Sequence, residues 1–331
     1  NIKLSLILSN DTIMNPPYEI TPTILKLINQ VSKKLGEVNA NFLDKPSPQL
    51  RKQNKIKTIH SSLSIEGNTL TEEQITALIE EKRVIGPKKD IEEVINAISI
   101  YKQLDSFDPY SINSFLNAHK ILMKGLVKDA GLFRTQEVGI VKGKKVQHLA
   151  PPFSNVPGLM SDLFKYLKNP DELCLIKSCV FHYEMEFIHP FLDGNGRMGR
   201  LWQTLILKEE YTVFEFLPFE TLISQTQDEY YKALSLSDKT GKSTVFIEYM
   251  LGVINESLEN MLSFNNRTLT DIERIEYFIA QGKQKFGRKD YMDVFKNISS
   301  STASRDLKKG IELNLIEKQG DKNKTVYIIK K

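Results

Sequence analysis

Apolar residues recur with the period of an α-helix along most of the chain. In residues 47–67, Ile56, Ile59 and Leu63 share one helical face, and Gly67 suits the C-terminus of that helix. The same period predicts further helices over 91–104, 111–126, 174–189, 197–210, 222–237 and 243–263. The chain is therefore predicted to be mainly α.

The phase of two segments predicts which side chains face the core. The first set, in 91–104, is Ile91, Ile95, Ile98 and Leu104. The second set, in the segment that Pro190 ends, is Leu173, Ile176, Val180, Tyr183 and Phe187. Polar residues mark two helix starts: Thr71 with Gln74 forms a capping-box pair, and Ser111 is a candidate N-cap.

One segment breaks the helical period. Two β-branched runs, Val138 to Val141 and Val146 to Leu149, flank a turn that contains glycine, and Pro151 and Pro152 end the second run. This pattern predicts a β-hairpin. A hairpin alone is marginally stable in water, so we expect it to pack on the helices or on a partner.

A polar stretch at 265–271 predicts a domain boundary. Beyond it, three short helical patterns precede two β-prone runs joined by a turn of Gly, Asp and Asn. Helices followed by a basic hairpin predict a winged helix-turn-helix domain over 270–331. The preceding part is divided into an N-terminal helical region, 1–100, and a helical core, 101–264.

Composition restricts the class of protein. The 331 residues are 40% hydrophobic and 26% charged, as in soluble globular proteins, and no run approaches the length of a membrane span. The first ten residues lack the small-residue cleavage site of a signal peptide. Cys174 and Cys179 are the two cysteines, which favours a reducing compartment, and we expect a cytoplasmic protein.

Basic residues gather at the C-terminal end. Residues 270–331 hold 14 Lys and Arg against 9 Asp and Glu, a net charge of +5 within a chain of +4. Arg305, Lys308 and Lys309 follow a run of Ser and Thr, and Lys318, Lys322 and Lys324 lie on the expected wing. These positions suit DNA phosphates. Winged helices also bind proteins or form dimers, so a protein partner and a homodimer are alternatives.

The richest chemistry lies between Phe187 and Trp202, in the run FIHPFLDGNGRMGRLW. Its GNGRMG matches a dinucleotide-binding fingerprint, but that fingerprint needs a preceding strand, and here a helix and Pro190 come first. His182, Glu186 and His189 are spaced to share a helical face and form an alternative zinc site.

The residues themselves favour phosphate binding. Glycines at 194 and 196 allow a tight turn, whose N–H groups can point at an anion at the start of the next helix. Arg197 and Arg200 are three residues apart and can reach one polyphosphate, Asp193 can hold Mg²⁺, and His189 can accept a proton. The alternative is a solvated basic helix end with a structural histidine.

At these residues the sequence resembles the Fic family, whose signature is H-x-F-x-[DE]-G-N-G-R-x-x-R. The positions are filled by His189, Phe191, Asp193, Gly194, Asn195, Gly196, Arg197 and Arg200. The resemblance extends over about residues 47–262 and implies a Fic-type helical bundle. It also implies an enzyme: a protein adenylyltransferase that moves AMP from ATP to a Ser, Thr or Tyr hydroxyl of a target protein.

The resemblance implies a role for each motif residue. His189 would be the general base, Asp193 the Mg²⁺ ligand and Phe191 a buried anchor. The ATP phosphates would be bound by Gly194, Asn195, Gly196, Arg197, Gly199 and Arg200. Tyr231 would contact adenine or ribose, with Tyr230 or core packing as alternatives. The hairpin would be a flap that binds the target by strand addition through Val138, Gly139, Ile140, Val141, Val146 and His148.

Ser62, Glu66 and Gly67 match the family's inhibitory pattern [ST]-x-x-x-E-[GN]. The implied mechanism pairs Glu66 with Arg200 and so removes the clamp on the γ-phosphate of ATP. The same glutamate could instead activate a water that removes AMP from a modified target. An alternative function is a DNA-binding transcriptional regulator in which the Fic core acts as a sensor.

Overall fold

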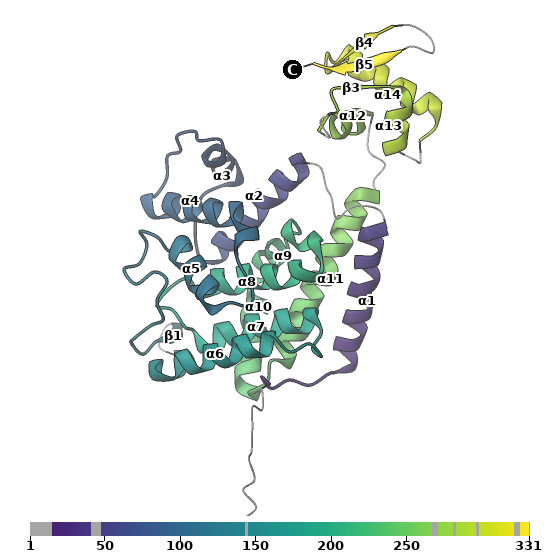
Figure 1. Ribbon diagram of the computed structural model, residues 1–331. Helices are drawn as coiled ribbons and strands as arrows, with labels where there is room; N and C mark the ends of the chain where they lie inside the picture. Colours follow the sequence, from purple (N-terminus) through teal and green to yellow (C-terminus); the bar gives the residue numbers. More distant parts are fainter. Residues whose placement is uncertain are drawn as a thin grey trace, which may run out of the picture.

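The structure is a computed structural model that describes the backbone of residues 15–40, 48–142, 145–266, 271–280, 283–295, 298–320 and 325–330. The chain is mainly helical, as predicted (Figure 1). Before residue 267 its helices are α1 (Pro22–Ala40), α2 (Pro48–Ile65), α3 (Glu72–Ile79), α4 (Lys88–Lys102), η1 (Leu104–Ser106), α5 (Ile112–Leu122), η2 (Phe153–Asn155), α6 (Val156–Leu167), α7 (Cys174–Ile188), α8 (Asn195–Glu210), η3 (Thr212–Glu215), α9 (Glu220–Gln225), α10 (Gln227–Thr240) and α11 (Thr244–Asn266).

One hydrophobic core holds these helices together. It runs from Ile24 in α1 to Leu262 in α11, and α1 lies along α11 (Figure 1). The predicted boundary near residue 100 lies within α4, and the core continues across it. Among the residues that the structure describes, no helix is both long and apolar enough to cross a membrane.

Helix α7 lies at the centre of this core. Ten of its side chains are buried, and they are spread around the helix rather than along one stripe. The predicted single face was therefore too narrow, because α6, α8 and α11 all pack on this helix. Leu173, which was expected to be buried, is 54% exposed, because it is the N-cap residue and precedes the helix.

The core face of α4 also differs from the prediction at one position. Ile95 is 46% exposed, whereas Val94, Ala97, Ile98 and Tyr101 are buried. The buried side of α4 is thus rotated from the predicted one, because the helix packs against both α2 and α5. A hydrophobic side chain at the edge of such a face can remain in solvent.

The ends of α2 and α3 follow the predicted signals. Gly67 has φ of +90°, its N–H donates to the carbonyl of Ser64, and the N–H of Asn68 donates to the carbonyl of Leu63. This Schellman motif ends α2 at Ile65, so Glu66 is the C-cap residue. Thr71 and Gln74 form the predicted capping box of α3, and Ser111 caps α5.

The predicted hairpin consists of β1 (Gly139–Lys142) and β2 (Lys145–Leu149), which pair antiparallel. The register pairs Gly139 with Leu149 and Lys142 with Lys145, and it shifts between Ile140 and Val141. Such a bulge bends a strand and increases its twist. The side chains of residues 139–149, which include every predicted docking position except the partly exposed Val138, lie outside the described part.

The C-terminal unit has its own core, around Ile275, Phe278, Tyr291 and Leu307. Its elements are α12 (Asp271–Ala280), β3 (Lys285–Phe286), α13 (Arg288–Val294), α14 (Ser300–Glu312), β4 (Ile316–Gln319) and β5 (Val326–Ile329). The three strands form an antiparallel sheet in the order β3-β5-β4 (Figure 1). This arrangement is consistent with the predicted winged helix-turn-helix.

A buried ion pair joins two helices of this unit. The Arg274 guanidinium on α12 donates to both carboxylate oxygens of Asp306 on α14, at 2.6 and 2.9 Å. The Tyr291 hydroxyl donates to the same carboxylate at 3.3 Å. Asp306 is fully buried, so its removal takes a bidentate carboxylate partner from the buried Arg274 guanidinium.

We expect Asp306→Ala to destabilise this unit by about 3 to 5 kcal/mol. Hydrogen exchange measured by mass spectrometry should then accelerate in residues 271–330 and stay unchanged in α7 and α8. The control is Glu312→Ala, which removes only an exposed pair with Lys309 at 3.7 Å. Equal protection of residues 271–330 in the two variants would contradict the role given to the pair.

Candidate active site

The candidate site is the turn between α7 and α8. Helix α7 ends at His189, which caps it in the left-handed conformation, with φ of 50° and ψ of 60°. A residue other than glycine rarely adopts this backbone conformation, so surrounding contacts must hold His189 in it. The turn then passes Pro190 and enters α8 through Gly194, which has φ of +87°.

Two side chains fix the shape of this turn from inside. The Asn195 amide donates to the Phe191 carbonyl at 2.9 Å and accepts from the Phe191 N–H at 2.9 Å. The Phe191 ring is fully buried and stacks on the His119 ring, with centroids 3.5 Å apart. Phe191 is thus placed as the predicted anchor. Asn195 was predicted at the phosphates, and its side chain holds the turn.

His119, on α5, was missed by the sequence analysis. Its Nδ1 accepts from the Gly131 N–H at 2.8 Å, so its Nε2 carries the proton and donates to the Asp193 carbonyl at 3.0 Å. Burial lowers the pKa of His119 to about 4, which keeps the ring neutral. No local pattern marks this residue, because its partners lie 12 and 74 positions away.

The space beside the two loop glycines is already filled. A Cβ at Gly194 would lie 2.7 Å from the sulfur of Met123. A Cβ at Gly196 would lie 2.4 Å from Oε1 of Glu66 and 3.1 Å from Nη1 of Arg200. The carboxylate of Glu66 therefore lies against the first turn of α8, where the helix dipole favours a negative charge.

Arg200 is fully buried and is held by α2. Its guanidinium donates to the Ser62 hydroxyl at 3.1 Å, to the Ser62 carbonyl at 2.9 Å and to Oε1 of Glu66 at 2.8 Å. Burial alone would lower the pKa of Arg200, but the Glu66 carboxylate raises it above its ordinary value. The predicted pair between Glu66 and Arg200 is present.

Arg197 is engaged elsewhere. Its Nη2 donates to the Asp193 carboxylate at 2.8 Å, and its Nη1 donates to Glu93 at 3.2 Å. Glu93, on α4, is buried and also accepts from the Asn68 side chain at 2.8 Å. In this structure the two guanidinium groups therefore bind different carboxylates. The sequence analysis missed Glu93, because its position on α4 has no motif around it.

Buried hydrogen bonds join α7 to α8 and α10 through His182. His182 is fully buried, with Nδ1 at 2.7 Å from Oε1 of Gln203 and Nε2 at 3.1 Å from the Tyr230 hydroxyl. Burial lowers the pKa of His182 to about 3. A Cβ at Gly199 would lie 2.8 Å from Cδ2 of His182, so Gly199 serves this close packing.

The structure bears on the alternative zinc site and on which of two adjacent tyrosines a nucleotide could contact. Within the described ranges, no group of three His, Cys, Asp or Glu side chains is arranged to hold a metal ion, which argues against zinc at His182, Glu186 and His189. Tyr230 is 2% exposed in the core, whereas the adjacent Tyr231 is 44% exposed. Of the two, Tyr231 is the one that a ligand could reach.

Arg134 connects the hairpin to the turn, although the sequence analysis gave it no role. Its side chain donates to the carbonyls of His189 at 2.8 Å and Gln136 at 2.9 Å, and also to that of Pro151. Its own N–H donates to the carbonyl of Pro190 at 2.8 Å. One buried guanidinium thus joins the residues before β1 and after β2 to the backbone of His189.

We expect Arg134→Met to remove the side-chain donor of the His189, Gln136 and Pro151 carbonyls and to lower the free energy of unfolding by about 2 to 4 kcal/mol. Urea unfolding gives this value, and hydrogen exchange should accelerate in residues 136–152 and 188–195. The matched control is Arg83→Met, at an exposed position. If exchange accelerated equally in all helices, Arg134 would be an ordinary core residue.

Glu220 is fully buried at the start of α9. Burial raises its pKa to about 8. The folded state therefore holds this proton at pH values where the unfolded chain, with a pKa of 4.5, has lost it. The resulting stability is full below pH 4.5 and is lost as the pH rises through 8.

Between pH 6 and pH 9 the wild type should lose about 2 to 3 kcal/mol more stability than Glu220→Gln, which mimics the protonated acid. Urea unfolding of both proteins at both pH values checks this difference. Equal losses would show that Glu220 does not carry the proton.

The comparisons with known proteins agree with this geometry. Residues 109–207 match the model of the Fic/DOC family. Protein adenylyltransferase fic-1 of Caenorhabditis elegans is 27% identical over 238 residues, which is 65% of this chain and 45% of the relative. Protein adenylyltransferase Fic of Nematostella vectensis is 25% identical over 260 residues, 73% of this chain and 58% of the relative. The chain thus spans about half the length of these curated relatives.

Solved structures share the fold over a larger part of the chain. A fragment of Fic-1 from C. elegans has a TM-score of 0.60 at 21% identity and covers 73% of this chain and 72% of its own length. A Fic family protein from Desulfovibrio desulfuricans G20 has a TM-score of 0.74 at 38% identity, over 96% of this chain and 98% of that one. With the complete motif on the α7–α8 turn, this likeness shows that the chain belongs to the Fic family.

Proposed function

We propose that the protein is a protein adenylyltransferase, described here in a self-inhibited state. The observation that carries the proposal is the position of Glu66: its carboxylate is 2.8 Å from Arg200 and lies against Gly196 at the start of α8. A buried arginine at a helix N-terminus, in a cradle built for a negative charge, suits a phosphate group. The names of the curated relatives support transfer of AMP.

The reaction would be an attack by a hydroxyl oxygen of the target protein on the α-phosphorus of ATP. A new oxygen–phosphorus bond forms, the bond from the α-phosphorus to the bridging oxygen breaks, and pyrophosphate leaves. His189, which is partly exposed at the end of α7, would accept the hydroxyl proton. The turn contributes mainly orientation and charge stabilisation.

Asp193 is the residue that would hold Mg²⁺. Its carboxylate side chain is 44% exposed, and one of its oxygens is paired with Arg197. Mg²⁺ in nucleotide sites is held by one or two carboxylates together with phosphates and water, so a single accessible carboxylate fits. The ion would neutralise phosphate charge during transfer.

Inhibition follows from competition for one position. Arg200 binds Glu66 and Ser62 with the same guanidinium edge that would bind the terminal phosphate. Helix α2 is held in this place by further bonds: the Ser61 hydroxyl donates to Thr221 at 3.2 Å, and the Gln227 amide donates to the Ile65 carbonyl at 2.9 Å. A triphosphate could bind productively only after Glu66 has moved.

Glu66→Gly should raise the incorporation of label from α-labelled ATP by about ten- to a hundredfold, because the charge that competes with the phosphate is removed. Incubation with cell lysate, followed by electrophoresis, measures self-modification and target modification together. Glu66→Gln is the matched control, because it keeps the size of the side chain but loses its charge. Its activity should lie between those of the wild type and Glu66→Gly.

His189→Ala in the Glu66→Gly background should abolish the labelling. Unchanged labelling in both the Glu66→Gly and the His189→Ala variants would show that these two roles are wrong.

Removal of AMP from a modified target remains a second direction for the same site. DNA binding by the C-terminal unit remains a prediction from the sequence.

A further inference from the structure

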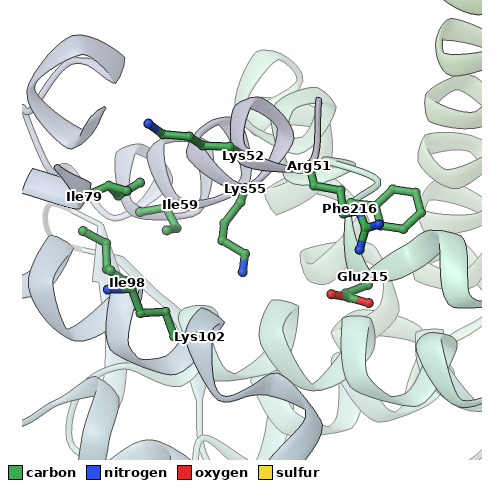
Figure 2. Close-up of a pocket in the computed structure, with 9 residues that line it drawn as sticks. All are labelled: Arg51, Lys52, Lys55, Ile59, Ile79, Ile98, Lys102, Glu215 and Phe216. Atoms are coloured by element: carbon green, nitrogen blue, oxygen red, sulfur yellow. The ribbon is translucent and has the colours of Figure 1, made fainter. Parts of the chain in front are cut away.

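A cavity of about 440 Å³ lies between α2, α3, α4 and η3, away from the candidate active site (Figure 2). None of its lining residues belongs to the α7–α8 turn or to the family motif. The lining residues are Arg51, Lys52, Lys55, Ile59, Ile79, Ile98, Lys102, Glu215 and Phe216. Four cations and one carboxylate thus surround a space with an apolar part.

The cations of the cavity differ in their surroundings. Lys52 points away from the space in Figure 2 and pairs with Glu80 at 2.8 Å. Lys55 extends from α2 into the space, and its ammonium donates to the Tyr101 carbonyl at 2.9 Å. Among the described side chains, no carboxylate forms an ion pair with Lys55 or Lys102. An anion could therefore add charge-assisted bonds at these two groups.

The charge balance of the cavity also favours an anion. Burial lowers the pKa of Lys55. The positive charge of Lys102 lowers this pKa further, whereas the carboxylates of Glu215 and Asp105 raise it. Asp105 is itself paired with Lys208. A bound anion near the two lysines would offset both the burial of Lys55 and its repulsion by Lys102.

Apolar side chains form the other part of the wall. Ile59 on α2 is fully buried behind the wall, whereas Ile79 is partly exposed, Ile98 is 9% exposed and Phe216 is 5% exposed. The three accessible side chains come from α3, α4 and the residue after η3. A ligand that fits both parts has a charged head and an apolar body.

We propose that this cavity binds a small organic phosphate, with its dianionic head at Lys55, Lys102 and Arg51 and its apolar body against Ile79 and Phe216. Because the cations come from both α2 and α4, the bound ligand joins these two helices. Lys55 lies on α2 and Glu66 directly follows the last residue of that helix, so an occupied cavity holds α2 where Glu66 meets Arg200. This consequence for activity rests on the proposed function, whereas the binding does not.

Isothermal titration calorimetry with phenyl phosphate tests the binding in the full chain carrying His189→Ala, so that no turnover interferes. Phenyl phosphate should bind about tenfold more tightly than inorganic phosphate, because only the former fills the apolar part. Lys55→Met and Lys102→Gln should each weaken binding about tenfold. The matched control is Lys168→Gln, an exposed lysine at the end of α6 that should bind like the parent.

Hydrogen exchange with and without phenyl phosphate tests the link to α2. Protection of residues 52–65 should rise in the parent and stay unchanged in Lys55→Met. Equal affinity in the parent and Lys55→Met, or equal weakening in Lys168→Gln, would overturn the site. Binding without added protection of α2 would overturn the link between helices. Neither readout involves ATP, so failure here is distinct from failure of the adenylyltransferase proposal.

Discussion

The structure depends on one electrostatic requirement: the fully buried guanidinium of Arg200 needs a negative partner. Burying a charge is costly unless hydrogen bonds and an opposite charge compensate it, and removing one partner of a buried pair is strongly destabilising. In this state Ser62 and Glu66 supply the compensation. In our proposal the terminal phosphate of ATP supplies it in the active state, so one site explains both inhibition and substrate binding.

The rest of the turn is built to keep its backbone in a strained shape. His189 is in the left-handed region without being a glycine, and the Arg134 guanidinium binds its carbonyl. Asn195 closes the loop onto Phe191, and His119 binds the Asp193 carbonyl. These buried groups surround the residues that would do the chemistry, and they hold N–H groups and side chains in a fixed arrangement before any ligand binds.

Part of this arrangement could be predicted from the sequence, and part could not. Helix ends with local signals, such as Gly67 and the Thr71–Gln74 box, could be predicted because their partners lie a few residues away. The Glu66–Arg200 pair, 134 positions apart, came only through the family resemblance. His119, Arg134 and Glu93 could not be predicted, because their roles come from contacts made after the helices pack. For the same reason the exposure of Ile95 and the packing role of Gly199 were not foreseen.

In the proposed mechanism, Glu66 and the triphosphate compete for Arg200. Calorimetric titration with a non-hydrolysable ATP analogue and magnesium measures this competition directly, in His189→Ala protein with and without Glu66→Gly. We expect at least about tenfold tighter binding when Glu66 is absent, since a charged partner of Arg200 no longer has to be displaced. Equal affinities, with Arg200 still paired to Glu66 in a structure of the complex, would contradict it.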